Sequence, residues 1–157
     1  MNKDSKIYVA GHRGLVGSAF IRKFHEAKQR GAATVTVWGS RSPLREFLYV
    51  DDLPEASRFL MNFDDGPYNY LLEDPSAPTL INVGSVEALS IHDLALLVKD
   101  IVGFDEDLLF DSSKPDGTPR KLADISRVHN LGWRSKTYLN TGINATYQWY
   151  LENRGLM

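Results

Sequence analysis

The chain has 157 residues, of which 43% are hydrophobic and 24% are charged, and this composition is typical of a single globular domain. Its formal net charge of -2 supplies no positive field, so we expect neither nucleic acid nor an anionic membrane as a partner. The absence of cysteine excludes disulfides, thiolate metal sites and a cysteine nucleophile. No apolar run approaches the roughly 20 residues that span a bilayer, and we expect a cytoplasmic protein.

The chain opens with the pattern of a dinucleotide-binding turn. Residues 6–10 predict a buried strand, and the glycine-rich segment 11–17 follows directly and opens a helix. Such glycines allow a tight turn, close approach of a pyrophosphate to the backbone, and close packing of helix on strand. The acidic residue expected about 20 residues later is missing, so a plain strand-to-helix turn is the alternative. The predicted phosphate-binding residues are Gly11, His12, Arg13, Gly14, Leu15, Val16 and Gly17.

Apolar residues at helical spacing predict a helix from residue 14 to about residue 29, which Gly31 ends. These apolar residues are Val16, Phe20, Phe24 and Ala27. Residues 34–38 alternate and are β-branched, which predicts a second strand. The first 40 residues should therefore form a strand–helix–strand unit with a right-handed crossover and parallel strands.

In the middle of the chain, residues 46–50 predict a short strand that leads into Asp51 or Asp52 as the N-cap of a helix. An N-cap is a better interpretation of this acidic pair than a metal site or a catalytic acid/base pair. Segment 62–78 is rich in proline and aspartate and predicts an irregular surface loop. Residues 80–83 predict another strand.

The C-terminal half carries clear helix and turn signals. Ser90, with Asp93 three residues later, resembles a capping box at the start of an amphipathic helix. Pro-Asp-Gly within residues 114–119 predicts a turn. A short strand at 108–110, a short helix capped by Ser126 and a last helix bearing Leu139, Ile143, Tyr147, Tyr150 and Leu151 complete the prediction. The four histidines have no ligand spacing, and we predict no metal site.

Several segments can be compared with a known enzyme family. They are residues 7–19, 21–27, 37–40, 45–52, 113–121 and 131–133. The most specific are Lys-Pro-Asp-Gly-Thr-Pro-Arg-Lys at 114–121, Trp-Gly-Ser at 38–40 and Arg-Glu-Phe at 45–47. Together the segments resemble the GDP-L-fucose synthase family of NAD-dependent epimerases/dehydratases, which are extended short-chain dehydrogenases/reductases.

The resemblance implies a reaction and also a missing part. Family members use NADPH (NADP as cofactor) for the 3,5-epimerisation and 4-reduction of GDP-4-keto-6-deoxymannose to GDP-L-fucose. Residues up to Ala19 resemble the family's N-terminus, whereas residues from Phe20 onward resemble its C-terminal half, so we expect an internal segment to be absent. Family members are homodimers, and the helices that form their interface are expected to lie in that segment.

The catalytic residues are expected to be missing with it. The family uses a Tyr-x-x-x-Lys pair with a nearby serine, in which the lysine lowers the pKa of the tyrosine that donates a proton. None of the seven tyrosines of this chain is followed by lysine at that spacing. The family's catalytic cysteine and histidine are also absent, and His25 is not that histidine. We therefore predict no catalytic residue and no activity for the chain alone.

Four positions match family contacts to the GDP-sugar, namely Lys23, Trp38, Arg45 and Asp116. Lys23 and Arg45 could neutralise pyrophosphate, Trp38 could offer an aromatic face, and Asp116 could accept hydrogen bonds from sugar or base. The alternatives are a solvated helix lysine, a core tryptophan, a surface salt bridge and a turn aspartate.

Two arginines, Arg13 and Arg41, differ in how they fit the family pattern. Arg13 resembles the family arginine that pairs with the 2′-phosphate of NADPH, although an exposed loop arginine is equally compatible with the sequence. Arg41 departs from the family, which usually has glycine there, so the loop beside Trp38 is expected to be altered.

The sequence thus predicts an α/β protein, in which a Rossmann-like N-terminal βαβ unit is fused to the smaller C-terminal substrate-binding α/β domain of an extended short-chain dehydrogenase/reductase. We expect a single compact domain over 1–157, with 1–40 as the Rossmann-like start and 41–157 as the region that resembles the GDP-sugar-binding domain. Its predicted function is that of a GDP-L-fucose synthase-like protein that is inactive alone. The alternatives are a non-catalytic GDP-sugar or nucleotide binding module and a non-functional truncated product.

Overall fold

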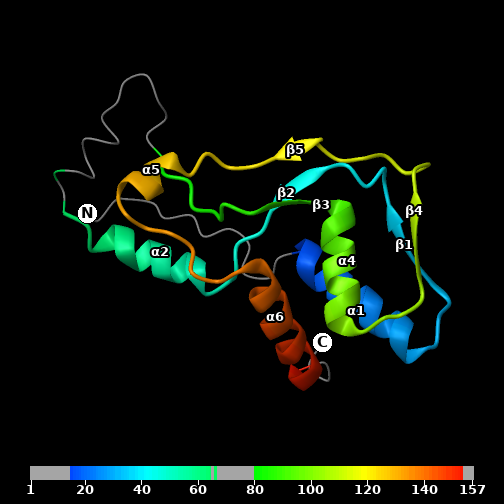
Figure 1. Ribbon diagram of the computed structural model, residues 1–157. Coiled ribbons are helices and arrows are strands. Elements are labelled where there is room, and N and C mark those ends of the chain that lie inside the picture. Colours follow the sequence, from blue (N-terminus) through cyan, green and yellow to red (C-terminus); the bar gives the residue numbers. More distant parts are fainter. Residues whose placement is uncertain (1–14, 65, 67–79, 154–157) are drawn as a thin grey trace.

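The computed structural model describes residues 15–64, 66 and 80–153, together with the side chains from residue 19 onward within them. The predicted strand at 6–10, Gly11 to Gly14 and most of the predicted loop 62–78 lie outside these residues. The elements are α1 (Leu15–Gln29), β1 (Thr34–Trp38), β2 (Leu44–Glu46), α2 (Asp52–Met61), β3 (Ala88–Ser90), α4 (Ile91–Val102), β4 (Asp107–Asp111), β5 (Arg120–Lys121), α5 (Ser126–Asn130) and α6 (Leu139–Asn153). Figure 1 shows these elements in an elongated molecule, with β1 and β4 at one end and α2 and α5 at the other.

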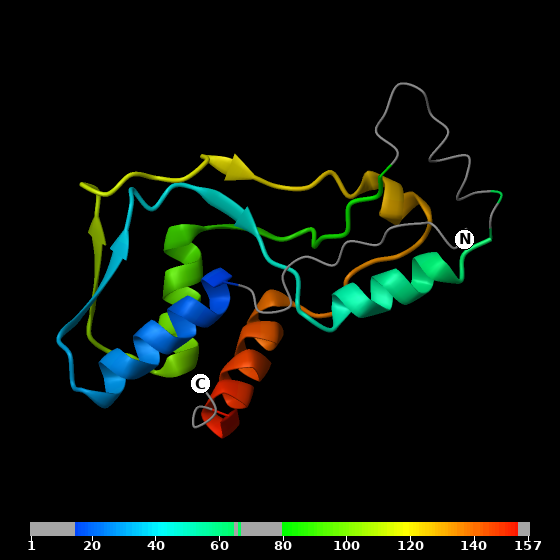
Figure 2. The ribbon, with the colours of Figure 1, turned by 180° about the vertical axis from the view of Figure 1, so that it is seen from behind.

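The larger core lies between three helices and a two-stranded sheet. Helices α1, α4 and α6 pack on one another, and α1 also contacts β1. Figure 2 shows α1 crossing α4, with α6 beside both. The buried members of this core are Ile21, Phe24, Ala27, Val35, Val37, Leu94, Ala95, Val98, Val102, Phe104, Ile143 and Tyr147. This burial of apolar side chains is the main stabilising force of the fold.

Helix α1 confirms the predicted helix, because it ends at Gln29 and Gly31 follows in the left-handed region, with φ of 62°. Phe24 is fully buried and packs edge-on against the ring of Phe104, at 5.8 Å between ring centroids. The helix continues without a break across residues 19 and 20. The position where the resemblance changes from one part of the family to another is therefore ordinary helix.

Strand β1 confirms the predicted strand at 34–38, and within the described residues its partner is β4. The two strands are parallel, with Thr34 opposite Asp107 and Trp38 opposite Asp111. The pairing with residues 6–10 that the sequence predicted lies outside the described residues. Because the strands are parallel, their carboxyl ends meet at one edge of the sheet.

A second sheet has the order β3-β2-β5, with β2 antiparallel to β3 and parallel to β5. It leads directly into α4, whose first N–H groups all find acceptors. Asp93 N donates to Ser90 Oγ at 3.0 Å, and Ser90 Oγ donates to Asp93 Oδ2 at 2.7 Å. Ile91 N donates to Pro43 O, and His92 N donates to Arg41 O. The predicted cap is thus confirmed, and the 41–43 loop completes it.

Three predictions about this part of the chain are wrong in detail. The strand predicted at 46–50 is β2, which ends at Glu46 where its pairing with β3 ends. Residues 80–83 form no strand within the described residues, because no described strand pairs with them. Ser126 is the first residue of α5 rather than its cap, and its N–H donates to Asp124 Oδ1 at 2.9 Å.

Helix α2 begins where predicted, but its start is not stabilised as predicted. The N-cap residue Asp51 makes no capping hydrogen bond through its side chain. Asp52 lies within the helix, is buried, and accepts hydrogen bonds from Thr137 N at 3.2 Å and Thr137 Oγ1 at 3.1 Å. Asp52 therefore ties α2 to the segment before α6.

A smaller apolar cluster holds α2, α5 and residues 80–87 together. Its buried members are Ala56, Val128 and Trp133. Glu46 fastens this region to β2, because its carboxylate accepts from Ser85 N at 2.7 Å and from Ala123 N at 3.1 Å. Gly84 is needed here, since a Cβ at this position would lie 1.7 Å from Glu46 Oε1. Within the described residues, no helix is both long enough and apolar enough to cross a membrane.

Candidate functional site

Three of the four predicted sugar-contacting residues lie on neighbouring segments at one edge of the β1–β4 sheet. Trp38 ends β1, and Arg45 lies in β2 after the intervening loop. Asp116 belongs to the turn that follows β4. Ligands of open α/β sheets bind at the carboxyl ends of the strands, where loops from different strands converge. The edge formed by these residues is the candidate site.

Asp116 is held by the residue two positions after Trp38. Its carboxylate accepts a hydrogen bond from Ser40 N at 2.7 Å and another from the Ser40 hydroxyl. The close approach requires Gly39, because a Cβ there would lie 2.3 Å from Asp116 Oδ1, and because φ of Gly39 is 99°. Asp116 therefore joins the loop after β1 to the turn after β4.

The same contacts keep the Asp116 carboxylate ionised. The Ser40 hydroxyl, followed by the Ser40 N–H and the charge of Arg45, lowers the pKa of Asp116 below its ordinary value of 3.8. The carboxylate is consequently a hydrogen-bond acceptor at neutral pH and has no proton to give.

Arg45 lies against the Asp116–Gly117 turn. Its Nη1 donates to Leu44 O at 2.7 Å, which fixes one side of the guanidinium group. A Cβ on Gly117 would lie 3.1 Å from Arg45 Nη2, so the turn passes close to the charged group. Arg45 thus brings a permanent positive charge to the site.

Trp38 is not the core tryptophan that the sequence also allowed, because 69% of it is exposed. The Lys114 ammonium lies over its ring, 5.7 Å from the ring centroid. Within β1 the neighbouring Val37 is buried, so strand alternation places Trp38 on the open side. The indole is a flat apolar surface with a cation beside it.

Lys23 has a different position. It extends from α1, and its ammonium donates to Thr36 O of β1. Thr36 lies two residues before Trp38, but no described contact joins Lys23 to Asp116 or Arg45. The structure therefore groups three of the predicted residues and leaves the lysine bonded to the strand beneath them.

The sequence interpretation missed Ser40 and Lys114. Ser40 was visible only as part of the Trp-Gly-Ser segment, and nothing in the sequence showed that its hydroxyl meets an aspartate 76 positions later. Lys114 was visible as a loop residue beside Pro-Asp-Gly. Both acquire a role through the pairing of β1 with β4.

The structure describes only part of the predicted phosphate-binding turn. Gly11, His12, Arg13 and Gly14 lie outside the described residues, while Leu15, Val16 and Gly17 form the first turn of α1, with side chains that are not described. His25 is buried, and its Nδ1 lies 3.0 Å from the hydroxyl of Tyr147. It is part of the core and does not reach the candidate site.

The chemistry available at the candidate site is that of binding. Arg45 and Lys114 offer positive charge, Asp116 offers an ionised acceptor, and Trp38 offers an aromatic face. The Asp116 carboxylate, whose pKa is lowered, has no proton to donate at neutral pH. The described part of the chain also contains no group of three His, Asp or Glu residues that could hold a metal ion.

Comparison with known proteins gives consistent matches. The model of the NAD dependent epimerase/dehydratase family matches residues 11–72. The probable GDP-L-fucose synthase 1 of Oryza sativa subsp. japonica is 53% identical over 135 residues, which are 86% of this chain and 38% of that protein. The GDP-L-fucose synthase of Escherichia coli is 46% identical over 138 residues, or 87% of this chain and 42% of that protein.

The fold also has solved counterparts. A GDP-mannoheptose C4 reductase from Campylobacter jejuni, solved with NADP bound, superposes with a TM-score of 0.73 at 37% sequence identity. The match covers 87% of this chain and 44% of the reductase. The chain therefore spans about two fifths of the length of the curated relatives that it matches.

Proposed function

We propose that this chain, which is similar to GDP-L-fucose synthases and in residues 11–72 to the NAD dependent epimerase/dehydratase family, binds a GDP-sugar and, alone, does not convert it. The observation that carries the proposal is the convergence of Trp38, Arg45 and Asp116 at one sheet edge. Trp38 and Arg45 lie on consecutive strands, Asp116 comes from a turn far from both in the sequence, and each residue supplies a group suited to part of a sugar nucleotide.

The proposed binding follows from the groups present. Arg45 provides paired N–H donors and a fixed charge for the diphosphate, since a guanidinium group matches phosphate oxygens in two-point contacts. Trp38 provides a flat surface on which a base or sugar ring lies. Asp116, ionised and fixed by Ser40, accepts from hydroxyl or N–H groups of the ligand. Lys114 supplies a second positive charge beside the ring.

The proposal excludes catalysis by the isolated chain for a chemical reason. Reduction of a ketone by hydride transfer needs a proton donor for the oxygen, and in this family that donor is a tyrosine activated by lysine. None of the seven tyrosines has lysine at the required spacing. Asp116, the carboxyl group beside Trp38, has a lowered pKa and cannot supply this proton at neutral pH.

Binding of NADPH would involve a different part of the chain, the predicted phosphate-binding turn before α1. NADP is bound in the matched reductase. In this chain, the described residues of the predicted phosphate turn are the first turn of α1, and a helix N-terminus there favours an anion. Arg13, which we propose for the 2′-phosphate, and the glycines before Leu15 lie outside the described residues. We include NADPH in the experiment as an independent ligand.

The proposal is tested by following thermal unfolding of the whole chain with GDP-fucose and, separately, with NADPH. A ligand at 100 times its dissociation constant raises the free energy of unfolding by about 2.7 kcal/mol. We expect a higher unfolding temperature with GDP-fucose. Absence of any shift at millimolar GDP-fucose would refute the proposed function.

Two variants make the experiment specific to the site. Asp116→Asn removes the charge at nearly constant size, and Trp38→Ala removes the aromatic surface; each should weaken GDP-fucose binding at least tenfold. Arg22→Ala is the matched control, because Arg22 is exposed on α1 and, among the described residues, forms its ion pair with Glu26, 3.8 Å away. If Arg22→Ala weakens binding as much as Asp116→Asn, the ligand is held by general charge and the site is wrong.

A further inference from the structure

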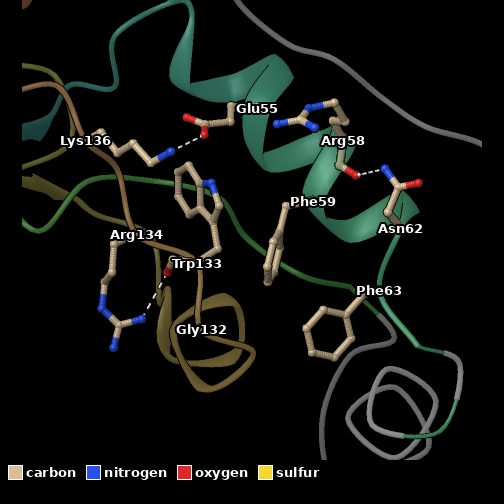
Figure 3. A pocket seen from close by; sticks show the side chains of 9 residues that line it. All are labelled: Glu55, Arg58, Phe59, Asn62, Phe63, Gly132, Trp133, Arg134 and Lys136. Carbon is tan, nitrogen blue, oxygen red and sulfur yellow. Dashed lines mark hydrogen bonds and ion pairs between the residues drawn. The ribbon is translucent and has the colours of Figure 1, made fainter.

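A second concavity lies at the other end of the molecule, between α2 and the segment 132–136 that follows α5. Figure 1 shows α2 and α5 at the end opposite to β1 and β4, so this pocket is separate from the GDP-sugar site. Its volume is about 480 Å³, within the range of small-molecule sites. The lining residues are Glu55, Arg58, Phe59, Asn62, Phe63, Gly132, Trp133, Arg134 and Lys136. Figure 3 shows these side chains on the two segments, with Arg58 on α2 and Arg134 on the far side of Trp133.

The pocket is positively charged although the chain as a whole is acidic. Arg58, Arg134 and Lys136 are set against a single carboxylate, that of Glu55, which forms an ion pair with the Lys136 ammonium. Arg134 Nη1 donates to His129 O at 2.7 Å and to Trp133 O at 3.0 Å, and no carboxylate in the pocket neutralises it. Two arginine charges therefore remain to attract an anion.

The charged residues stand beside an aromatic wall. The rings of Phe59 and Phe63 are 5.2 Å apart between centroids and inclined by 54°, and both residues are only partly buried. A flat ring can lie against such partly exposed aromatic side chains. An arginine beside an aromatic wall is suited to a ligand that joins a ring to an anionic group.

The third feature is an unsatisfied donor. Trp133 is 4% exposed, and its indole Nε1 is buried with no hydrogen-bond partner in the described part of the chain. Figure 3 shows the nitrogen-bearing edge of the indole directed toward α2, on the pocket side. A buried N–H without an acceptor destabilises the fold because it has lost its hydrogen bonds to water. An acceptor atom of a bound ligand would remove this cost.

We propose that this pocket binds a nucleoside monophosphate, with its base against Phe59 and Phe63, its phosphate on Arg58, and an oxygen or ring nitrogen on Trp133 Nε1. The site is independent of the GDP-sugar site in both position and residues. Glu55 keeps the Lys136 ammonium engaged, so Arg58 carries the phosphate, and the charge of Arg134 at the rim adds to the attraction.

The experiment is isothermal titration of the whole chain with AMP, and separately with adenosine and with inorganic phosphate. We expect AMP to bind, and adenosine and phosphate each to bind at least tenfold more weakly. If adenosine binds as well as AMP, the arginines have no role and the proposal is overturned. If phosphate binds as well as AMP, the aromatic wall has no role and the proposal is equally overturned.

Variants then assign the site. Arg58→Ala should weaken AMP binding about tenfold or more, the loss expected for one charge-assisted hydrogen bond, and Arg134→Ala should weaken it less. Arg30→Ala is the matched control, because Arg30 is also an exposed arginine and lies outside the pocket, and it should change binding less than about twofold. Equal effects of Arg30→Ala and Arg58→Ala would overturn the proposal.

The two sites are separated by one further variant. Arg45→Ala disables the GDP-sugar site and should leave AMP binding unchanged. If Arg45→Ala abolishes AMP binding, the nucleotide occupies the sheet edge and the pocket at α2 is not its site. Trp133→Phe, which keeps an aromatic ring and removes the N–H, should weaken AMP binding while the circular dichroism spectrum stays unchanged.

Discussion

Arg41 has a backbone conformation that favours glycine. Its φ is 84°, and in the described part of the chain no other residue except glycine has a positive φ. The left-handed region costs an L-residue about 1–2 kcal/mol relative to the right-handed helical region. Two contacts compensate: the Arg41 carbonyl accepts from His92 N, and the guanidinium lies 4.6 Å from the centroid of the Phe110 ring. The glycine expected from the family at this position therefore has a physical explanation.

We predict that Arg41→Gly unfolds at higher urea concentration than Arg41→Ala. Both variants lose the contact with Phe110, but alanine keeps the unfavourable φ whereas glycine adopts it freely. The difference in the free energy of unfolding should be about 1 kcal/mol in favour of glycine. Equal stability of the two variants would mean that the loop relaxes to a negative φ.

The titration of Asp116 supplies a second prediction at this scale. Because its pKa is lowered below 3.8, chiefly by the Ser40 hydroxyl, the interaction is fully present above 3.8 and is lost as the pH falls through the lower folded pKa. In Ser40→Ala the backbone N–H bond remains and the hydroxyl bond is gone, so the pKa of Asp116 should rise toward 3.8. Carboxyl-carbon NMR measures this midpoint directly, and an unchanged midpoint would contradict the assigned cause.

Residue by residue, the candidate site was only partly predictable. Trp38, Arg45 and Asp116 could be identified through the family resemblance, but their proximity depends on β1 pairing with β4, which has no local sequence signal. Ser40 could not be assigned for the same reason. Lys23 lies in a helix that was predicted well, but its bond to Thr36 O is a tertiary contact that the sequence could not show.

At the scale of elements, local signals determined what could be foreseen. The bounds of α1 and β1 agree with hydrophobic spacing because both elements bury one face in the same core. The Ser90 cap agrees because it depends on neighbours in sequence. Residues 80–83 have the apolar composition of a strand. A strand also needs a partner strand for its backbone hydrogen bonds, and no described strand pairs with these residues. Strand β2 is short because its pairing with β3 ends at Glu46.

The cap of α4 gives a prediction with a matched control. Ser90→Ala removes the acceptor of Asp93 N and should lower the free energy of unfolding by about 1 kcal/mol. Ser57→Ala is the control, because the Ser57 hydroxyl bonds to Leu53 O within α2 and alanine is the better helix former there. Urea unfolding should show a loss for Ser90→Ala and little change for Ser57→Ala; similar losses for both would argue against the cap.

At the scale of the whole molecule, the two apolar clusters are unequal. Within the described residues, twelve residues are buried in the core of α1, α4, α6, β1 and β4, against three in the cluster that holds α2 and α5. Figure 1 shows that the smaller cluster lies at the end of the molecule away from β1 and β4. Stability against local opening follows the number of buried apolar contacts.

We therefore predict that amide hydrogens of α4 around Leu94 and Val98 exchange most slowly, and that those of α2 around Ala56 exchange markedly faster. Hydrogen exchange followed by mass spectrometry or NMR measures both in one sample. Equal protection of α2 and α4 would mean that the two clusters unfold as one cooperative unit. GDP-fucose should slow exchange in β1 and β2 rather than in α2.

Helix α1 is continuous across residues 19 and 20, where the two regions of family resemblance meet. The number of helical residues at this point therefore sets the direction of the segment before Phe20. One additional residue ahead of Phe20 would turn the preceding part of the helix by about 100° and move it by about 1.5 Å along the axis. Three or four additional residues would nearly restore the original direction. A change of length at this point that is out of step with the helical turn would therefore redirect the part of α1 before Phe20, while the core around Phe24 would keep its place.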